Sequence, residues 1–98
     1  MLEIKENIHF TLSEDIKVRS VSKDDQHFVF NIKTGDHYAL NKTANWVLTQ
    51  LINKKIAFEQ LLNGFIKTFS LLPEKARMDL QEVLIYAIEN KIVEEVKK

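Results

Sequence analysis

The side chains that could do chemistry are few, and their spacing does not gather them into a reactive group. The three histidines, His9, His27 and His37, fall on separate segments that are expected to be strands. None of them lies four residues from another ligand, whereas a zinc site needs three or four convergent ligands. The chain has no cysteine, which excludes thiolate ligands, a thiol nucleophile and disulfides. We therefore expect no metal site and no cofactor.

The carboxylates do not form a catalytic pair either. Asp24 and Asp25 fall in an expected turn, and four further acidic residues lie on the outward face of the last long helical segment: Glu74, Asp79, Glu82 and Glu89. Solvated charge accounts for both groups. The chain has no glycine-rich phosphate loop and no G-x-S-x-G or H-E-x-x-H motif. The sequence thus predicts a protein that is not an enzyme and works by binding.

The composition is that of an ordinary globular domain. Apolar residues make up 45% and charged residues 29% of the 98 residues, which suffice for one hydrophobic core, so we expect a single domain over 1–98. Lys plus Arg balance Asp plus Glu at 14 each, so no net field favours nucleic acid or an acidic membrane. No apolar run could span a bilayer and no signal pattern opens the chain, which indicates a cytoplasmic protein.

The first half of the chain has the two-residue hydrophobic period of strands. Strands are expected over 8–12, 17–22, 27–32 and 37–40, with polar turns at 23–26 and 33–36. In a meander of sequential order the segment His37, Tyr38, Ala39, Leu40 is an edge strand. It carries none of the lysines or prolines that usually blunt a free edge, so it is a candidate for accepting an added peptide strand.

Three amphipathic helices are expected to follow the strands. Asn41 is a good N-cap for a helix to about residue 53, a second helix covers 57–69, and Pro73 opens a third to about residue 90. Trp46 projects away from the apolar face of the first helix and is expected to pack over the sheet. Strands followed by helices predict an α+β domain that is winged-helix-like, with an N-terminal antiparallel three- to four-stranded meander and then three helices.

The third helix has an apolar arc that is expected to face the core, made of Ala76, Leu80, Val83, Leu84, Ala87 and Ile88. Met78 and Ile85 lie outside this arc, with Gln81 beside them. Two readings remain open for them. They form a second binding surface, or they pack on the N-terminal segment or stand alone as exposed apolar residues.

A longer motif resembles a known family. The stretch 28–44, F-V-F-N-I-K-T-G-D-H-Y-A-L-N-K-T-A, resembles the PqqD-like family of precursor-peptide recognition elements, and its L-N-x-[ST]-A portion is the most specific part. Family positions on the helices are matched by Leu61, Phe65, Phe69, Asp79, Leu80, Val83, Leu84, Ala87, Ile92 and Val93. The resemblance covers about residues 17–95.

The resemblance implies a winged-helix-like domain that binds the leader of a ribosomally made precursor peptide. The leader adds as a strand to the third sheet strand and lies against the third helix. The implied binding residues are His37, Tyr38, Ala39, Leu40, Met78, Gln81, Leu84 and Ile85. The implied partners are the leader peptide and, in trans, a leader peptidase, cyclase or other modifying enzyme. An exposed edge also permits self-pairing, so a monomer or a weak homodimer is expected.

Alternatives and departures accompany this reading. The free-standing form is most similar to the recognition proteins of lasso-peptide biosynthesis, with a PqqD-type chaperone of quinone cofactor biosynthesis as the alternative. A winged-helix DNA-binding regulator is the rival from another class, although the third helix balances its basic residues with acidic ones. A structural subunit of an enzyme is a third alternative. Ala57 stands at a usual Ser or Thr cap, Lys91 at a usual Gly, and Ile85 and Tyr86 at commonly polar positions.

Overall fold

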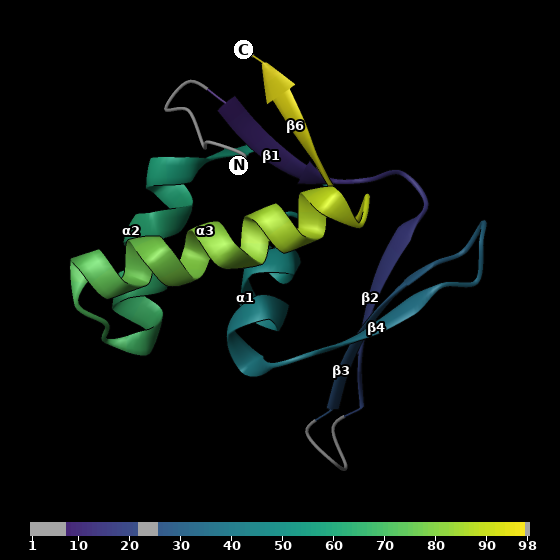
Figure 1. Ribbon diagram of the computed structural model, residues 1–98, viewed down its shortest axis with the longest axis horizontal. Helices are drawn as coiled ribbons and strands as arrows, with labels where there is room; N and C mark the ends of the chain where they lie inside the picture. Colours follow the sequence, from purple (N-terminus) through teal and green to yellow (C-terminus); the bar gives the residue numbers. More distant parts are fainter. Residues whose placement is uncertain (1–7, 22–25, 98) are drawn as a thin grey trace.

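Two antiparallel sheets and three helices make up the part of the chain that the computed structural model describes, residues 8–21 and 26–97 (Figure 1). The strands are β1 (Ile8–Leu12), β2 (Ile16–Val21), β3 (Gln26–Asn31), β4 (His37–Leu40), β5 (Ile56–Ala57) and β6 (Val93–Lys97), and the helices are α1 (Lys42–Gln50), α2 (Phe58–Phe69) and α3 (Pro73–Glu89). The predicted α+β class is confirmed. The turn predicted at 23–26 lies outside the described residues except for Gln26, which begins β3.

The first strand does not join the meander that the sequence predicts. It forms its own sheet in the order β5-β1-β6, in which Leu12 opposes Val93 and Ile8 opposes Lys97. The side chains of Ile8 and Phe10 are buried in the core cluster with residues of the helices, so the apolar face that the alternating pattern marks packs against the core. The meander therefore has three strands, β2-β3-β4, and the winged-helix description fits only loosely.

The helices begin and end for identifiable reasons. The side-chain oxygen of Asn41 accepts a hydrogen bond from the amide of Ala44 at 2.8 Å, which confirms the predicted N-cap of α1. No side chain caps α2 at Ala57, the departure that the sequence shows. Helix α3 ends with Lys91 at a φ of 61°, and the amide of Ile92 donates to the carbonyl of Ala87 at 2.8 Å. This is a Schellman motif with lysine in the usual glycine position.

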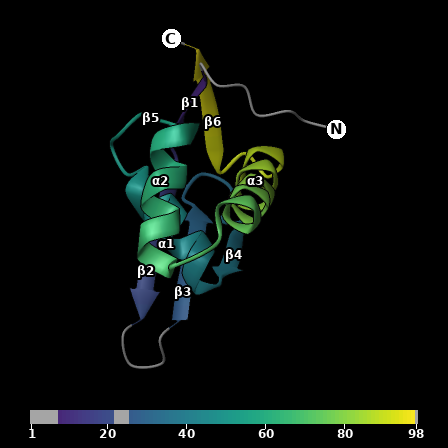
Figure 2. The same ribbon diagram turned by 90° about the vertical axis from the view of Figure 1, so that its left-hand side faces the viewer.

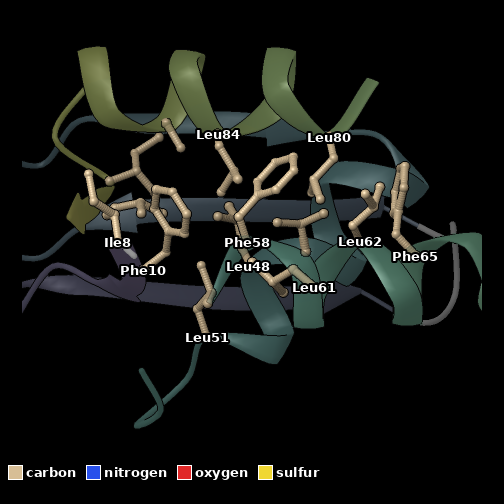
Figure 3. Packing of buried hydrophobic residues seen from close by; sticks show 14 of the residues in the cluster. Ile8, Phe10, Leu48, Leu51, Phe58, Leu61, Leu62, Phe65, Leu80 and Leu84 are labelled. Carbon is tan, nitrogen blue, oxygen red and sulfur yellow. The ribbon is translucent and has the colours of Figure 1, made fainter. Parts of the chain in front are cut away.

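The core lies where the three helices meet both sheets. Helix α3 contributes Ala76, Leu80, Leu84 and Ala87, and α2 contributes Phe58, Leu61, Leu62 and Phe65. Figure 3 shows Leu80 and Leu84 pointing from α3 into this cluster. The expectation that Trp46 packs over the sheet is wrong, because its ring lies 5.8 Å from that of Phe65 and 6.0 Å from that of Phe69, both on α2. Helix α1 itself contacts β2, β3 and β4, and so holds the three-stranded sheet against the other helices.

Candidate functional site

Strand β4 is an edge of the three-stranded sheet, as the sequence predicts. Its neighbour is β3, and among the described strands none pairs with its other side. Figure 2 shows β4 on the same side of the molecule as α3, and Figure 1 shows the two running in opposite directions. The open edge therefore faces a region that a helix borders.

The turn before β4 fixes which main-chain groups the open edge presents. The amide of Asn31 donates to the carbonyl of Asp36 at 2.8 Å, and the amide of Gly35 donates to the carbonyl of Asn31 at 2.8 Å. Gly35 and Asp36 therefore both oppose Asn31, which makes a β-bulge. Gly35 has a φ of 83°, a backbone conformation that favours glycine. Asn31 consequently occupies a hydrogen-bonded position of the β3–β4 ladder.

Opposed residues of an antiparallel ladder alternate between pairs that exchange hydrogen bonds and pairs that do not. Counted from Asn31, the pair of Val29 and Tyr38 is a bonded one, and so is the pair that contains Leu40. The main-chain groups of Tyr38 and Leu40 therefore face β3. Those of His37 and Ala39, two amides and two carbonyls, face the open edge.

Side chains on β4 also alternate. Those of Tyr38 and Leu40 are half-buried and pack against the core, whereas those of His37 and Ala39 are exposed on the other face. The Tyr38 ring meets the ring of Tyr86 on α3 edge to face, with centroids 6.3 Å apart. Edge-to-face aromatic pairs are favourable, so this contact ties β4 to α3. Tyr86 keeps 49% of its surface exposed and remains accessible from solvent.

A pocket of about 250 Å³ lies beside this aromatic pair, between the end of β4, the start of α1 and the second half of α3. It is lined by Ala39, Leu40, Asn41, Ala44, Leu48, Glu82, Val83, Tyr86, Ala87 and Ile92. Most of these side chains are apolar, and Glu82 is the charged one among them. The arrangement offers main-chain hydrogen bonds at an edge and an apolar recess next to it, which is suited to an extended peptide.

No protein-family model matches this sequence, and no curated protein does either. Solved structures match over most of their length. TbiB1 in complex with the TbiA(beta) leader peptide superposes with a TM-score of 0.72 and 15% identity, covering 86% of this chain and 94% of that one. A lasso peptide synthetase B1 complexed with the leader peptide gives 0.71 and 18%, covering 87% and 96%.

The third match is the solution structure of the PqqD truncation of PqqCD from Methylobacterium extorquens, described as a stand-alone recognition element for ribosomally synthesised and post-translationally modified peptides. It gives a TM-score of 0.74 and 15% identity, covering 94% of this chain and 95% of that one. The chain has the PqqD-like fold. The fold implied by the motif in residues 28–44 is thereby confirmed.

Within the PqqD-like fold, the open edge of β4 and the pocket beside it form a groove. The predicted binding residues of α3 do not all lie at this groove. Leu84 is 0% exposed and belongs to the core. Met78 is 64% exposed and lines a separate hollow with Leu72 and Pro73, at the corner between α2 and α3. Gln81 and Ile85 are half-buried and do not line the pocket beside β4. Of the four predicted residues of β4, Ala39 and Leu40 line the pocket and Tyr38 contacts Tyr86 beside it, whereas none of the four of α3 lines it.

The α3 residues that do reach the pocket are Glu82, Val83, Tyr86 and Ala87. Sequence reasoning assigned Val83 and Ala87 to the core and Glu82 to a solvated face. Tyr86 was the sequence feature that could have indicated the α3 side of the groove, since an aromatic residue at a commonly polar position is typical of a binding surface. The helical period shows which residues share a face, but it cannot show which face turns toward β4.

Across 8–21 and 26–97, no three His, Asp or Glu side chains gather where they could hold a metal ion. The histidines lie on three different strands, β1, β3 and β4. No helix in the described part of the chain is long and apolar enough to cross a membrane.

Proposed function

We propose that this chain binds the leader of a ribosomally made precursor peptide as an added strand on β4. One observation carries the proposal: the main-chain groups of His37 and Ala39 face the open edge of β4, and Ala39 and Leu40 line an apolar pocket against α3. Two structures that share the fold were solved with leader peptides bound, which supports leader binding by this chain. The domain would be non-catalytic and would act as an adaptor in lasso-peptide biosynthesis.

The energetics assign different tasks to the edge and the pocket. Main-chain hydrogen bonds contribute about 0.5–1.5 kcal/mol each, so the two amides and two carbonyls together contribute roughly 4 kcal/mol. Association itself costs at least about 4 kcal/mol in lost translational and rotational freedom. The edge alone therefore leaves little net affinity. An apolar leader side chain buried in the pocket adds about 1.5–3 kcal/mol, so the pocket supplies both affinity and selectivity.

An adaptor of this kind accelerates processing without reacting. A leader held on β4 keeps the attached core peptide near any leader peptidase, cyclase or other modifying enzyme that contacts the domain. The effective concentration of the substrate then rises to about the millimolar range for a short flexible connection. Delivery to such an enzyme in trans is part of the proposal.

A second candidate uses the same groove. The match to the PqqD truncation covers 94% of this chain at a TM-score of 0.74, which favours a PqqD-type peptide chaperone in quinone cofactor biosynthesis as an alternative setting. Both candidates require leader binding at β4. They differ in the precursor that binds and in the enzyme that follows.

The test is a titration of the ¹⁵N-labelled domain with the leader half of a short precursor peptide encoded beside it, with the core half of that precursor as the control. We expect saturable leader binding, with amide shifts concentrated at residues 37–40 and 82–87. Trp46 packs against α2 and does not line the pocket, so the amides and the Tyr86 ring are better reporters than its fluorescence. Absence of saturable binding, or shifts confined to another surface, would overturn the proposal.

A further inference from the structure

The charge of the groove is concentrated at one point. Glu82 is the charged residue among those that line the pocket, and its side chain is exposed at the rim. The nearby cations of α3 are engaged elsewhere: Lys75 lies 3.4 Å from Asp79, and Arg77 lies 3.0 Å from Glu59. Within residues 8–21 and 26–97 no cation pairs with the Glu82 carboxylate. An apolar recess with an uncompensated carboxylate at its rim is complementary to a peptide that carries both an apolar and a basic side chain.

The positions of these two leader side chains can be worked out from the geometry of β4 and α3. Two residues along a strand advance about 6.6 Å. One turn of α3, from Tyr86 back to Glu82, advances about 6 Å in the opposite sense along the chain. Strand β4 and α3 run in opposite directions (Figure 1), and Tyr38 contacts Tyr86. This geometry puts Glu82 about level with Leu40, and both residues line the pocket.

A strand added beyond β4 would follow the same alternation of faces. Its residue opposite Tyr38 and its residue opposite Leu40 would both project toward α3, because side chains two apart share a face. The first of them would meet the ring of Tyr86. The second would reach the rim of the pocket at Glu82. These two leader positions are residues i and i+2 of the leader, whether the added strand runs parallel or antiparallel.

We propose that the groove selects leaders with a Lys or Arg two residues along the strand from the side chain that contacts Tyr86, held by the carboxylate of Glu82. The inference rests on the proposed function and names the substrate class of the same site. The pocket itself supplies most of the affinity, and the ion pair sets the register of the leader. A one-residue slip would turn the basic side chain to the opposite face, away from Glu82.

The expected effects follow from the exposure of Glu82. A solvent-exposed ion pair changes a dissociation constant by about 1.5- to 5-fold, so Glu82→Gln should weaken leader binding by about that factor. Glu82→Lys replaces attraction by repulsion and should weaken binding by roughly 10-fold at low salt, with a smaller effect at high salt. Glu94→Lys is the matched control, because Glu94 is exposed on β6 in the other sheet and the change in net charge is the same.

The deciding experiment is a double-mutant cycle measured by calorimetry between the full chain and the leader half of the precursor encoded beside it. Each Lys or Arg of the leader is changed to Glu in turn. We expect one of these leaders to bind poorly to the native domain and to recover its affinity with Glu82→Lys but not with Glu94→Lys. Contacts between Tyr86 and the bound leader, seen by NMR, should identify a residue two positions away from that basic residue.

Each other outcome separates the inference from the proposed function. If the native domain binds the leader and Glu82→Lys binds as tightly, or if the coupled residue lies at another spacing, charge selection by Glu82 is refuted while leader binding stands. A leader that binds but has no Lys or Arg refutes it equally. If the native domain binds no leader, the proposed function fails, and this inference fails with it. Glu82→Gln, which introduces no new charge, guards against misfolding of the Lys variant.

Discussion

Replacing Ala39 by proline should strongly weaken leader binding while leaving the domain folded. The amide of Ala39 faces the open edge and makes no ladder hydrogen bond to β3. Proline at this position therefore removes a donor that the described part of the chain does not use. Proline is tolerated on edge strands when its nitrogen faces outward, and the preceding residue, Tyr38, is already extended. We therefore expect the free energy of unfolding to change by less than about 1 kcal/mol.

The loss of affinity has two parts. The hydrogen bond from Ala39 to the leader is worth about 0.5–1.5 kcal/mol net. The leader carbonyl that it would have met stays near the proline ring without a donor, which costs about 1–3 kcal/mol more. The total of roughly 1.5–4.5 kcal/mol corresponds to at least about a 10-fold rise in the dissociation constant.

The assay pairs calorimetric titration of the leader with urea unfolding of each variant. Ala39→Ser keeps the amide and should bind the leader almost as the native chain does. Tyr38→Pro is the contrasting variant, because the Tyr38 amide faces β3 and its loss should lower the free energy of unfolding by about 1–3 kcal/mol. If folded Ala39→Pro bound the leader within threefold of the native chain, strand addition at β4 would be refuted.

Two further substitutions test the surroundings of the groove. Leu84→Ala should lower the free energy of unfolding by about 2–5 kcal/mol in urea titrations, because the side chain is 0% exposed, and a loss below 1 kcal/mol would show that it is not a core residue. Asn41→Ala should cost about 1 kcal/mol through loss of the α1 cap, whereas Asn41→Ser should retain most of the stability, and equal unfolding midpoints for the two would contradict the capping role.

The features that the sequence predicts well are those encoded by local chemistry. Asn41 caps α1 because its side chain reaches an amide three residues on, and this needs no knowledge of the rest of the fold. The polar turn at 33–36 and the strand after it are also local, and Gly35 in that turn has a positive φ. Likewise, the apolar period of α2 identifies Leu61 and Phe65 as core residues before any partner is known.

The features that the sequence does not predict depend on contacts between distant segments. The pattern at Ile8 and Phe10 identifies a strand with one buried face, but not the strands that pair with it, which are β5 and β6. Strand β6 is hard to predict from the sequence because Glu94 and Glu95 interrupt its apolar alternation. Strand β5 is only two residues long, too short to show a pattern. Strand pairing across the chain is a property of the assembled core rather than of either segment.

The groove shows the same limit at the level of one helix. Its β4 half is predicted because an edge strand without lysine or proline can be recognised from sequence. On α3 the sequence predicts that the face of Met78 and Ile85 lines the groove. The face that lines it is that of Glu82 and Tyr86, less than one helical turn away. The rotation of α3 about its axis is set by how Leu80 and Leu84 pack into the core, which the helical period alone does not determine.

The pairing of β1 with β6 also sets an order of events during synthesis. A ribosome adds roughly 5–20 residues per second, and domains fold as their segments emerge. The hairpin of β3 and β4 can close as soon as its own residues are made, whereas β1 must wait for 56–57 for the two-residue strand β5 and for 93–97 for its longer partner β6. The strand that we assign to leader capture therefore forms early, and the sheet that contains β1 is completed only after β6 is translated.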